Sequence, residues 1–139
     1  MNKRTIFLLI VLLAAIGGGF AWKEYHRTTA KADELPVKET VNAQDLMTAF
    51  ITDEDAATAR FVGTTEQVVQ VTGTISAIDP AGKLTNIVLG TDNDLAGVVC
   101  EFAAADVPAD WRSGASVTIK GICTGMLIDV VLVRCTAVE

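Results

Sequence analysis

The 139-residue sequence has a single histidine, three cysteines and few aromatic residues, which make up 6% of the chain. The one histidine, His26, follows the hydrophobic N-terminal stretch, so no Cys–His catalytic pair can form inside a folded domain. The cysteines at 100, 123 and 135 are spaced too widely for a zinc site. We therefore expect neither catalytic residues nor metal ligands nor a cofactor. We also expect that the protein is not an enzyme.

Basic residues are scarce as well. Lys and Arg number 11 against 17 Asp and Glu, which gives a formal net charge of −6. Beyond Gly63 the only cations are Lys83, Arg112, Lys120 and Arg134. A domain with this balance should repel polyanions, so nucleic acid is a disfavoured partner.

One long hydrophobic run is present, from Thr5 to Trp22, without a charged residue. As a helix it would be roughly 27 Å long, close to the thickness of a bilayer core, and Lys3 and Arg4 precede it. The alternative is a cleaved signal peptide, for which the small residues at 17–19 could provide the cleavage site. Trp22 and Lys23, which follow closely, make this a poor sequence for signal peptidase. A buried core helix would need a larger partner than this chain offers.

These features divide the chain into an anchor or signal segment over residues 1–22, a solvated tether over 23–41 and a folded domain over 42–139. No cysteine precedes Cys100, so we expect anchoring by the helix rather than by a lipidated cysteine. The short basic leader favours an exported domain outside the cytoplasm, in a bacterial periplasm or envelope, and secreted to the periplasm if the segment is cleaved.

The folded domain is predicted to begin with helices. Asn42 is a plausible N-cap for an amphipathic helix over 43–51, and Asp53 can cap a second over 54–61 that ends at Gly63. One irregular helix of about twenty residues is the alternative.

After Gly63 the hydrophobic period changes to two, which predicts five strands within residues 66–79, 83–90, 98–102 and the segment "GASVTIKGICTGMLIDVVLVRC". A turn is expected at 79–82 and a helical interruption between the third and fourth strands. Gly73 and Gly121 interrupt strands at inward positions, as at the corners of a small barrel. The fold class is therefore mainly β, a five-stranded Greek-key barrel with a leading amphipathic helix.

The segments "VVQVTGTISAID", "IVLGTDNDLAGVVCEF" and "GASVTIKGICTGMLIDVVLVRC" resemble the exported OB-fold proteins grouped as tRNA-anti-like. The resemblance covers residues 42 to 138 and implies the OB barrel, but no activity. Many members of the family look like lipoproteins, whereas this chain lacks the lipidation cysteine.

All three cysteines are predicted to point inward, Cys123 beside Val117 and Ile119, and Cys135 beside Val131 and Val133. In an oxidising compartment a Cys123–Cys135 disulfide would close a loop of about a dozen residues, with Cys100 competing for either partner. The register is imperfect, because Cys123 should lie opposite Leu132. Three buried thiols are the alternative.

The expected function is a membrane-anchored or exported binding module with a protein or glycan ligand. Its candidate ligand face consists of Thr72, Thr74, Ser76, Asn86 and Val99; an ordinary solvated sheet face is the alternative. The competing function is a cytoplasmic OB domain that binds single-stranded nucleic acid. The outward positions expected on the second and third strands, 86, 88, 99 and 101, carry neither aromatic nor basic residues, which disfavours it. The loop from Asp92 to Gly97 resembles a calcium loop only at its start, and we interpret it as a turn.

Overall fold

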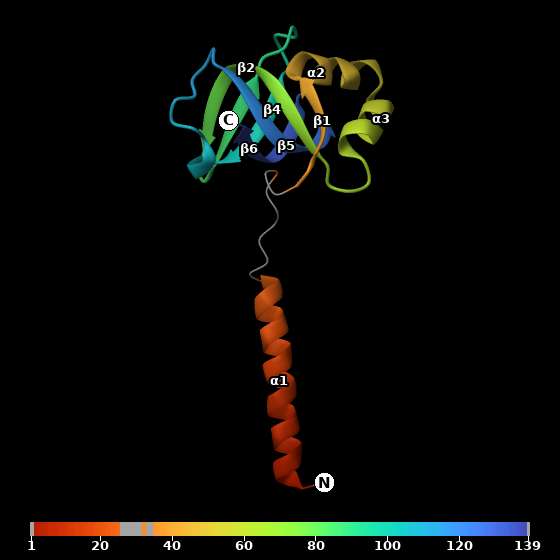
Figure 1. Cartoon of the computed structure of the whole chain (residues 1–139), viewed down its shortest axis with the longest axis vertical. Coiled ribbons are helices and arrows are strands. Elements are labelled where there is room, and N and C mark those ends of the chain that lie inside the picture. The colour runs from red at the N-terminus through yellow and green to blue at the C-terminus, as the bar shows by residue number, and fades with distance from the viewer. Residues whose placement is uncertain (1, 26–31, 33–34, 139) are drawn as a thin grey trace.

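The computed structural model describes residues 2–25, 32 and 35–138; part of the expected tether, including His26, lies outside them. The first described helix, α1 (Lys3–Tyr25), stands apart from a β-barrel that is flanked by two short helices (Figure 1). Within α1, the stretch Lys3–Trp22 is long and apolar enough to cross a membrane, with a mean hydropathy of 2.3 and none of it buried against protein. The expected apolar N-terminal helix is therefore present.

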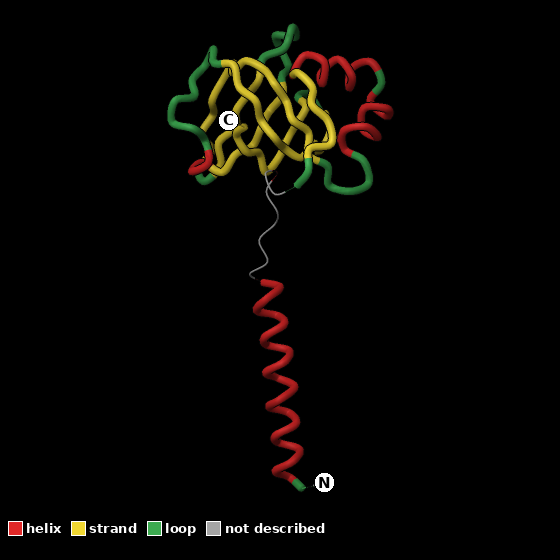
Figure 2. The backbone as a smooth tube through the Cα atoms, in the orientation of Figure 1, coloured by secondary structure: helices red, strands yellow, loops and turns green. Residues whose placement is uncertain are grey.

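Six strands form the sheet, in the order β1-β2-β3-β4-β6-β5, and a further β2–β5 pairing closes it into a barrel (Figure 2). The predicted five-stranded barrel is confirmed as the closed part of this sheet. The strands are β1 (Val37–Asn42), β2 (Val68–Ala81), β3 (Leu84–Leu89), β4 (Val98–Ala103), β5 (Ser116–Met126) and β6 (Val130–Val138).

Strand β1 lies in the segment that the sequence predicts to be a tether, so this part of the prediction is wrong. It pairs in parallel with β2, placing Asn42 opposite Thr72. A second small apolar cluster lies beside it, where Ala32 and Val68 pack with Ile122. The chain is thus held to the barrel before the leading helix begins.

The two predicted helices are present, as α2 (Ala43–Thr52) and α3 (Glu54–Ala57), and α3 continues into one π-helical turn, η2 (Thr58–Val62). Asn42 Oδ1 accepts from Asp45 N at 2.7 Å, and Asp53 Oδ1 accepts from Ala56 N at 3.1 Å. Gly63, at φ +65°, ends the segment. Both side-chain caps satisfy N–H groups that have no partner inside a helix.

The barrel interior is filled by alternating residues of each strand, as the period of two predicts. Ile87, Cys100 and Phe102 are fully buried there. One local detail differs from expectation: the β2–β3 turn is Gly82-Lys83 rather than 79–82, since Ala81 pairs directly with Leu84. The helical interruption expected between the third and fourth predicted strands is present as η3 (Ala104–Asp106).

Candidate functional site

The predicted ligand-face residues lie in three places on the barrel. Thr72 and Thr74 point outward from β2, opposite Thr118 and Ser116 of β5. The Ser76 hydroxyl instead donates to the carbonyl oxygen of Val88 at 3.2 Å. The structure therefore brings the first two predicted residues together and separates Ser76 from them.

Asn86 and Val99 lie on the β3–β4 part of the sheet. Asn86 is opposite Glu101, and Val88 is opposite Val99. The outward positions that the sequence predicted for these two strands are thus correctly assigned. This surface presents an amide, a carboxylate and two valines.

A groove of about 470 Å³ lies over the outer face of β2 and β5. Its size is within the range of about 300–1,000 Å³ that small-molecule sites occupy. The lining residues are Asn42, Thr72, Gly73, Thr74, Trp111, Ser116, Val117, Thr118 and Val138. Sequence reasoning found Thr72 and Thr74 but missed the rest. The β2–β5 pairing could not be located from periodicity, and Trp111 lies in an irregular loop.

The three cysteines are buried free thiols, so the predicted Cys123–Cys135 disulfide is wrong. As expected from the sequence, Cys123 lies opposite Leu132, which also pairs with Cys100 of β4. Burial raises the pKa of Cys123 to about 11. The pKa of Cys135 is also raised, first by burial and then by a hydrogen bond with Cys100. These are poor nucleophiles, because few thiolates form at neutral pH.

On β6, the prediction that Cys135 points inward is correct, but the predicted inward residues that precede it in the strand are wrong. Val130 and Leu132 point inward, rather than Val131 and Val133. The reason is an irregularity at Arg134, which has φ 52° and lies where the β5–β6 register shifts. Such a bulge adds one residue to a strand and reverses the side-chain alternation, which sequence periodicity does not reveal.

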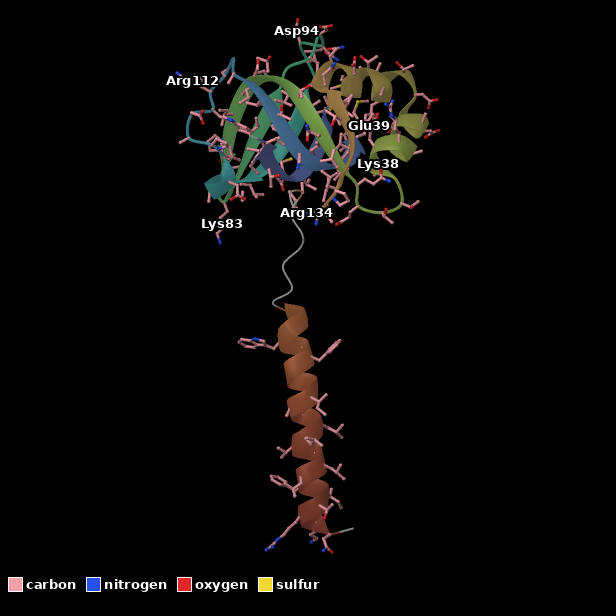
Figure 3. The ribbon with its side chains drawn as sticks, in the orientation of Figure 1. Lys38, Glu39, Lys83, Asp94, Arg112 and Arg134 are labelled. Atoms are coloured by element: carbon pink, nitrogen blue, oxygen red, sulfur yellow. The ribbon has the colours of Figure 1, made fainter. Side chains whose placement is uncertain are left out.

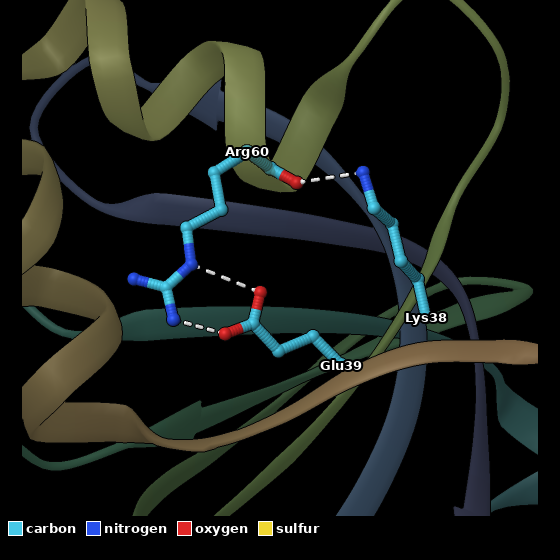
Figure 4. A network of polar contacts seen from close by, with 3 residues as sticks. All are labelled: Lys38, Glu39 and Arg60. Atoms are coloured by element: carbon cyan, nitrogen blue, oxygen red, sulfur yellow. Dashed lines mark hydrogen bonds and ion pairs between the residues drawn. The ribbon is translucent and has the colours of Figure 1, made fainter.

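Polar contacts hold β1 beside the η2 turn (Figure 4). Arg60 makes two contacts with the Glu39 carboxylate, one from Nε at 3.0 Å, and Lys38 Nζ donates to the carbonyl oxygen of Arg60 at 3.3 Å. The Glu39 hydrogen bond raises the pKa of Arg60. Lys38 also donates to Gln67 Oε1 at 2.8 Å. This network ties the strand after the tether to the helical segment.

The labelled cations do not form one patch. Lys83 and Arg112 lie away from Lys38 and Arg134 in Figure 3, whereas Lys38 and Arg134 contact the adjacent residues Gln67 and Glu66. Two of these cations are engaged with carboxylate or carbonyl groups, Arg134 through an ion pair with Glu66. Among the residues the structure describes, no group of three or more His, Cys, Asp or Glu side chains could hold a metal ion.

The closed five-stranded barrel with its leading helix is an OB fold preceded by an apolar helix. The chain belongs to the tRNA_anti-like family, whose model matches residues 1–137. A search of curated proteins finds no match.

Among solved structures, the chain is similar to a protein from Klebsiella pneumoniae subsp. pneumoniae that is provisionally named a nucleic acid-binding lipoprotein. The two chains share 18% sequence identity, with a TM-score of 0.56 over 72% of this chain and 92% of the other. At this identity the similarity establishes the shared fold.

Proposed function

We propose that the protein is a non-catalytic OB-fold binding module that α1 holds at a cell-envelope membrane, with the barrel outside the cytoplasm. The observation that carries the proposal is the apolar stretch Lys3–Trp22, none of which is buried against protein. A helix of this composition needs an apolar environment that the barrel does not supply. The Klebsiella neighbour is named a lipoprotein, which supports envelope anchoring for that protein and, by analogy, for this chain.

The barrel would act as a binding surface rather than as an enzyme. Its thiols are buried, with raised pKa values at Cys123 and Cys135, and its one histidine lies outside the described residues. The outward polar side of β2, with Thr72 and Thr74, supports a ligand role because these side chains line a groove.

The experiment is a topology and fractionation assay on the full chain. Alkaline phosphatase fused to the C-terminus should be active, and the fusion should remain in the membrane pellet after alkaline carbonate extraction. The matched control is a double variant that carries Leu9→Arg and Leu13→Arg. This variant should be released from the pellet, because charges at the centre of a helix oppose its insertion into a membrane. An inactive phosphatase together with active cytoplasmic GFP at the same position would contradict the proposed location.

A second candidate is a single-stranded nucleic-acid-binding domain, which the name of the Klebsiella neighbour favours. Nucleic acid binding requires cations that follow a backbone and aromatic rings that stack on bases. The β3–β4 surface presents Asn86, Val88, Val99 and Glu101 instead. Oligonucleotide affinity that falls steeply with salt would support this candidate over the first.

A further inference from the structure

The groove over β2 and β5 is organised as rows of side chains across the sheet. Asn42 pairs with Thr72, Thr72 with Thr118, and Thr118 with Val138, so one row crosses β1, β2, β5 and β6. The row that pairs Thr74 with Ser116 lies next to it. Short polar side chains therefore cover a continuous area of sheet.

Within the part of the chain that the structure describes, the side-chain oxygens of Thr72, Thr74, Ser116 and Thr118 take part in no hydrogen bond. Other barrel hydroxyls differ. Those of Ser76, Ser113 and Thr124 donate to the carbonyl oxygens of Val88, Ser76 and Val131. Each hydroxyl in the groove can therefore both donate to and accept from a ligand.

Trp111 supplies an aromatic surface at the same groove. Its ring packs against buried Phe102 in an edge-on arrangement, with ring centroids 5.6 Å apart and an angle of 80°. The loop that carries it is fixed to β2, since Gly114 N donates to Ile75 O at 2.7 Å. The indole is therefore positioned before any ligand arrives, which lowers the entropic cost of binding.

The groove also lacks charge. Each of its lining side chains is uncharged, whereas two other hollows on the barrel include charged residues, and one of these hollows adjoins the groove at Asn42 and Thr72. The hollow of about 510 Å³ beside β1 is lined by Glu39, Asp45 and Arg60. The hollow of about 280 Å³ after β3 is lined by Asp94 and Asp129. The lining itself therefore offers no ion pair to a phosphate or carboxylate ligand; the cation two residues from Thr118 on β5, Lys120, lies opposite Gln70 in the next row.

We infer that this groove binds a neutral oligosaccharide, with Trp111 beneath the apolar face of one sugar ring and the groove hydroxyls bonded to sugar hydroxyls. A neutral sugar has both features that the groove matches, a surface of C–H groups and many hydroxyls that donate and accept. The site lies on β2 and β5, not on the β3–β4 surface that OB folds commonly use. The inference rests on the proposed function, because it names the ligand class of that binding module.

The test uses the intrinsic fluorescence of the full chain in lipid nanodiscs. Trp111 and Trp22 are the two tryptophans, so a Trp22→Phe background leaves Trp111 as the only reporter. Chitotetraose, maltotetraose and cellotetraose are titrated separately. At least one should change the Trp111 emission in a saturable way, with an affinity independent of salt between about 50 and 200 mM, a range over which phosphate contacts weaken strongly.

Variants that preserve the fold separate recognition from stability. Isothermal titration calorimetry should show Thr118→Val, which keeps the side-chain shape, weakening saccharide binding about five- to tenfold, with the circular dichroism spectrum unchanged. Trp111→Ala should abolish measurable binding. Asn86→Ala, on the β3–β4 surface, is the matched control and should bind as the parent does.

Two results would overturn the inference. One is the absence of saturable binding to all three tetrasaccharides at millimolar concentration. The other is binding that Asn86→Ala weakens and Thr118→Val does not. If the periplasmic phosphatase reporter is active, either result contradicts the saccharide site but not the proposed membrane-anchored binding module. An inactive reporter would instead contradict the proposed location of the barrel outside the cytoplasm.

Discussion

Gly121 of β5 faces Cys135 of β6 so closely that a Cβ atom on Gly121 would lie 2.6 Å from Cys135 Sγ. The same Cβ would lie 2.9 Å from the Cβ of Leu132. The glycine is therefore required by close packing inside the barrel, where the Arg134 bulge turns Cys135 inward.

Gly121→Ala should lower the free energy of unfolding by about 1–3 kcal/mol, the usual cost of overpacking a core. Denaturant unfolding in detergent micelles measures it. Gly90→Ala is the control, because a Cβ there would make only ordinary contacts, the nearest at 3.5 Å from Ser76. Adding Cys135→Ala to Gly121→Ala should recover part of the loss, and purely additive effects would show that the two side chains do not compete for space.

The three cysteines should behave as protected thiols. Under native conditions Cys100, Cys123 and Cys135 should resist alkylation, because they are buried. In guanidinium chloride without a reductant, all three should react, and mass spectrometry counts the added groups. Protein purified from an oxidising compartment that gains only one group before reduction would contradict the free-thiol arrangement.

Stability should fall as the pH rises from about 9 to 11. The pKa of Cys123 is raised to about 11 from an ordinary value of 9.0, so the folded state keeps a proton that the unfolded state releases in this range. The stabilisation is complete below pH 9 and is lost as the pH passes through the folded-state pKa, a change of about 2–3 kcal/mol. Cys123→Ala should show a shallower decline, as measured by urea unfolding at each pH; an equally steep decline would exclude this thiol as its source.

Thr136 offers a stabilising substitution. Its Oγ1 atom is buried and has no hydrogen-bond partner within the described chain. Because an unsatisfied buried hydroxyl is costly, Thr136→Val should raise the free energy of unfolding by about 1 kcal/mol. Thermal unfolding provides the measurement, with Thr124→Val as the control: the Thr124 hydroxyl donates to Val131 O, so its loss should not stabilise. A destabilised Thr136→Val would indicate that the hydroxyl has a partner in solution.

The features of the fold that depend on local sequence patterns could be predicted from the sequence. Alternation identified the inward faces of β3 and β4, including Ile87 and Cys100, and the side chains of Asn42 and Asp53 identified the helix starts. The parallel strand β1 escaped detection because its charged, partly exposed sequence has no apolar alternation that distinguishes it from a tether.

Only Thr72 and Thr74 of the candidate site were predicted, because the rest of the site depends on contacts distant in the sequence. Thr72 and Thr74 were found on the outward side of their strand, but their neighbours Thr118 and Ser116 follow from the β2–β5 closure. The disulfide is absent because Cys123 lies opposite Leu132, three residues before Cys135, a mismatch that the sequence register already indicated. What the sequence did not mark is the bulge at Arg134 that precedes Cys135.

The central claim is that the barrel recognises its ligand through the β2–β5 groove. NMR chemical-shift mapping of the full chain in nanodiscs, titrated with the tetrasaccharide that binds, tests it most directly. The account predicts that shifts concentrate at the amides of Thr72 and Thr118 and at the indole N–H of Trp111. Shifts concentrated instead at Asn86 and Glu101 would contradict it and place recognition on the β3–β4 surface.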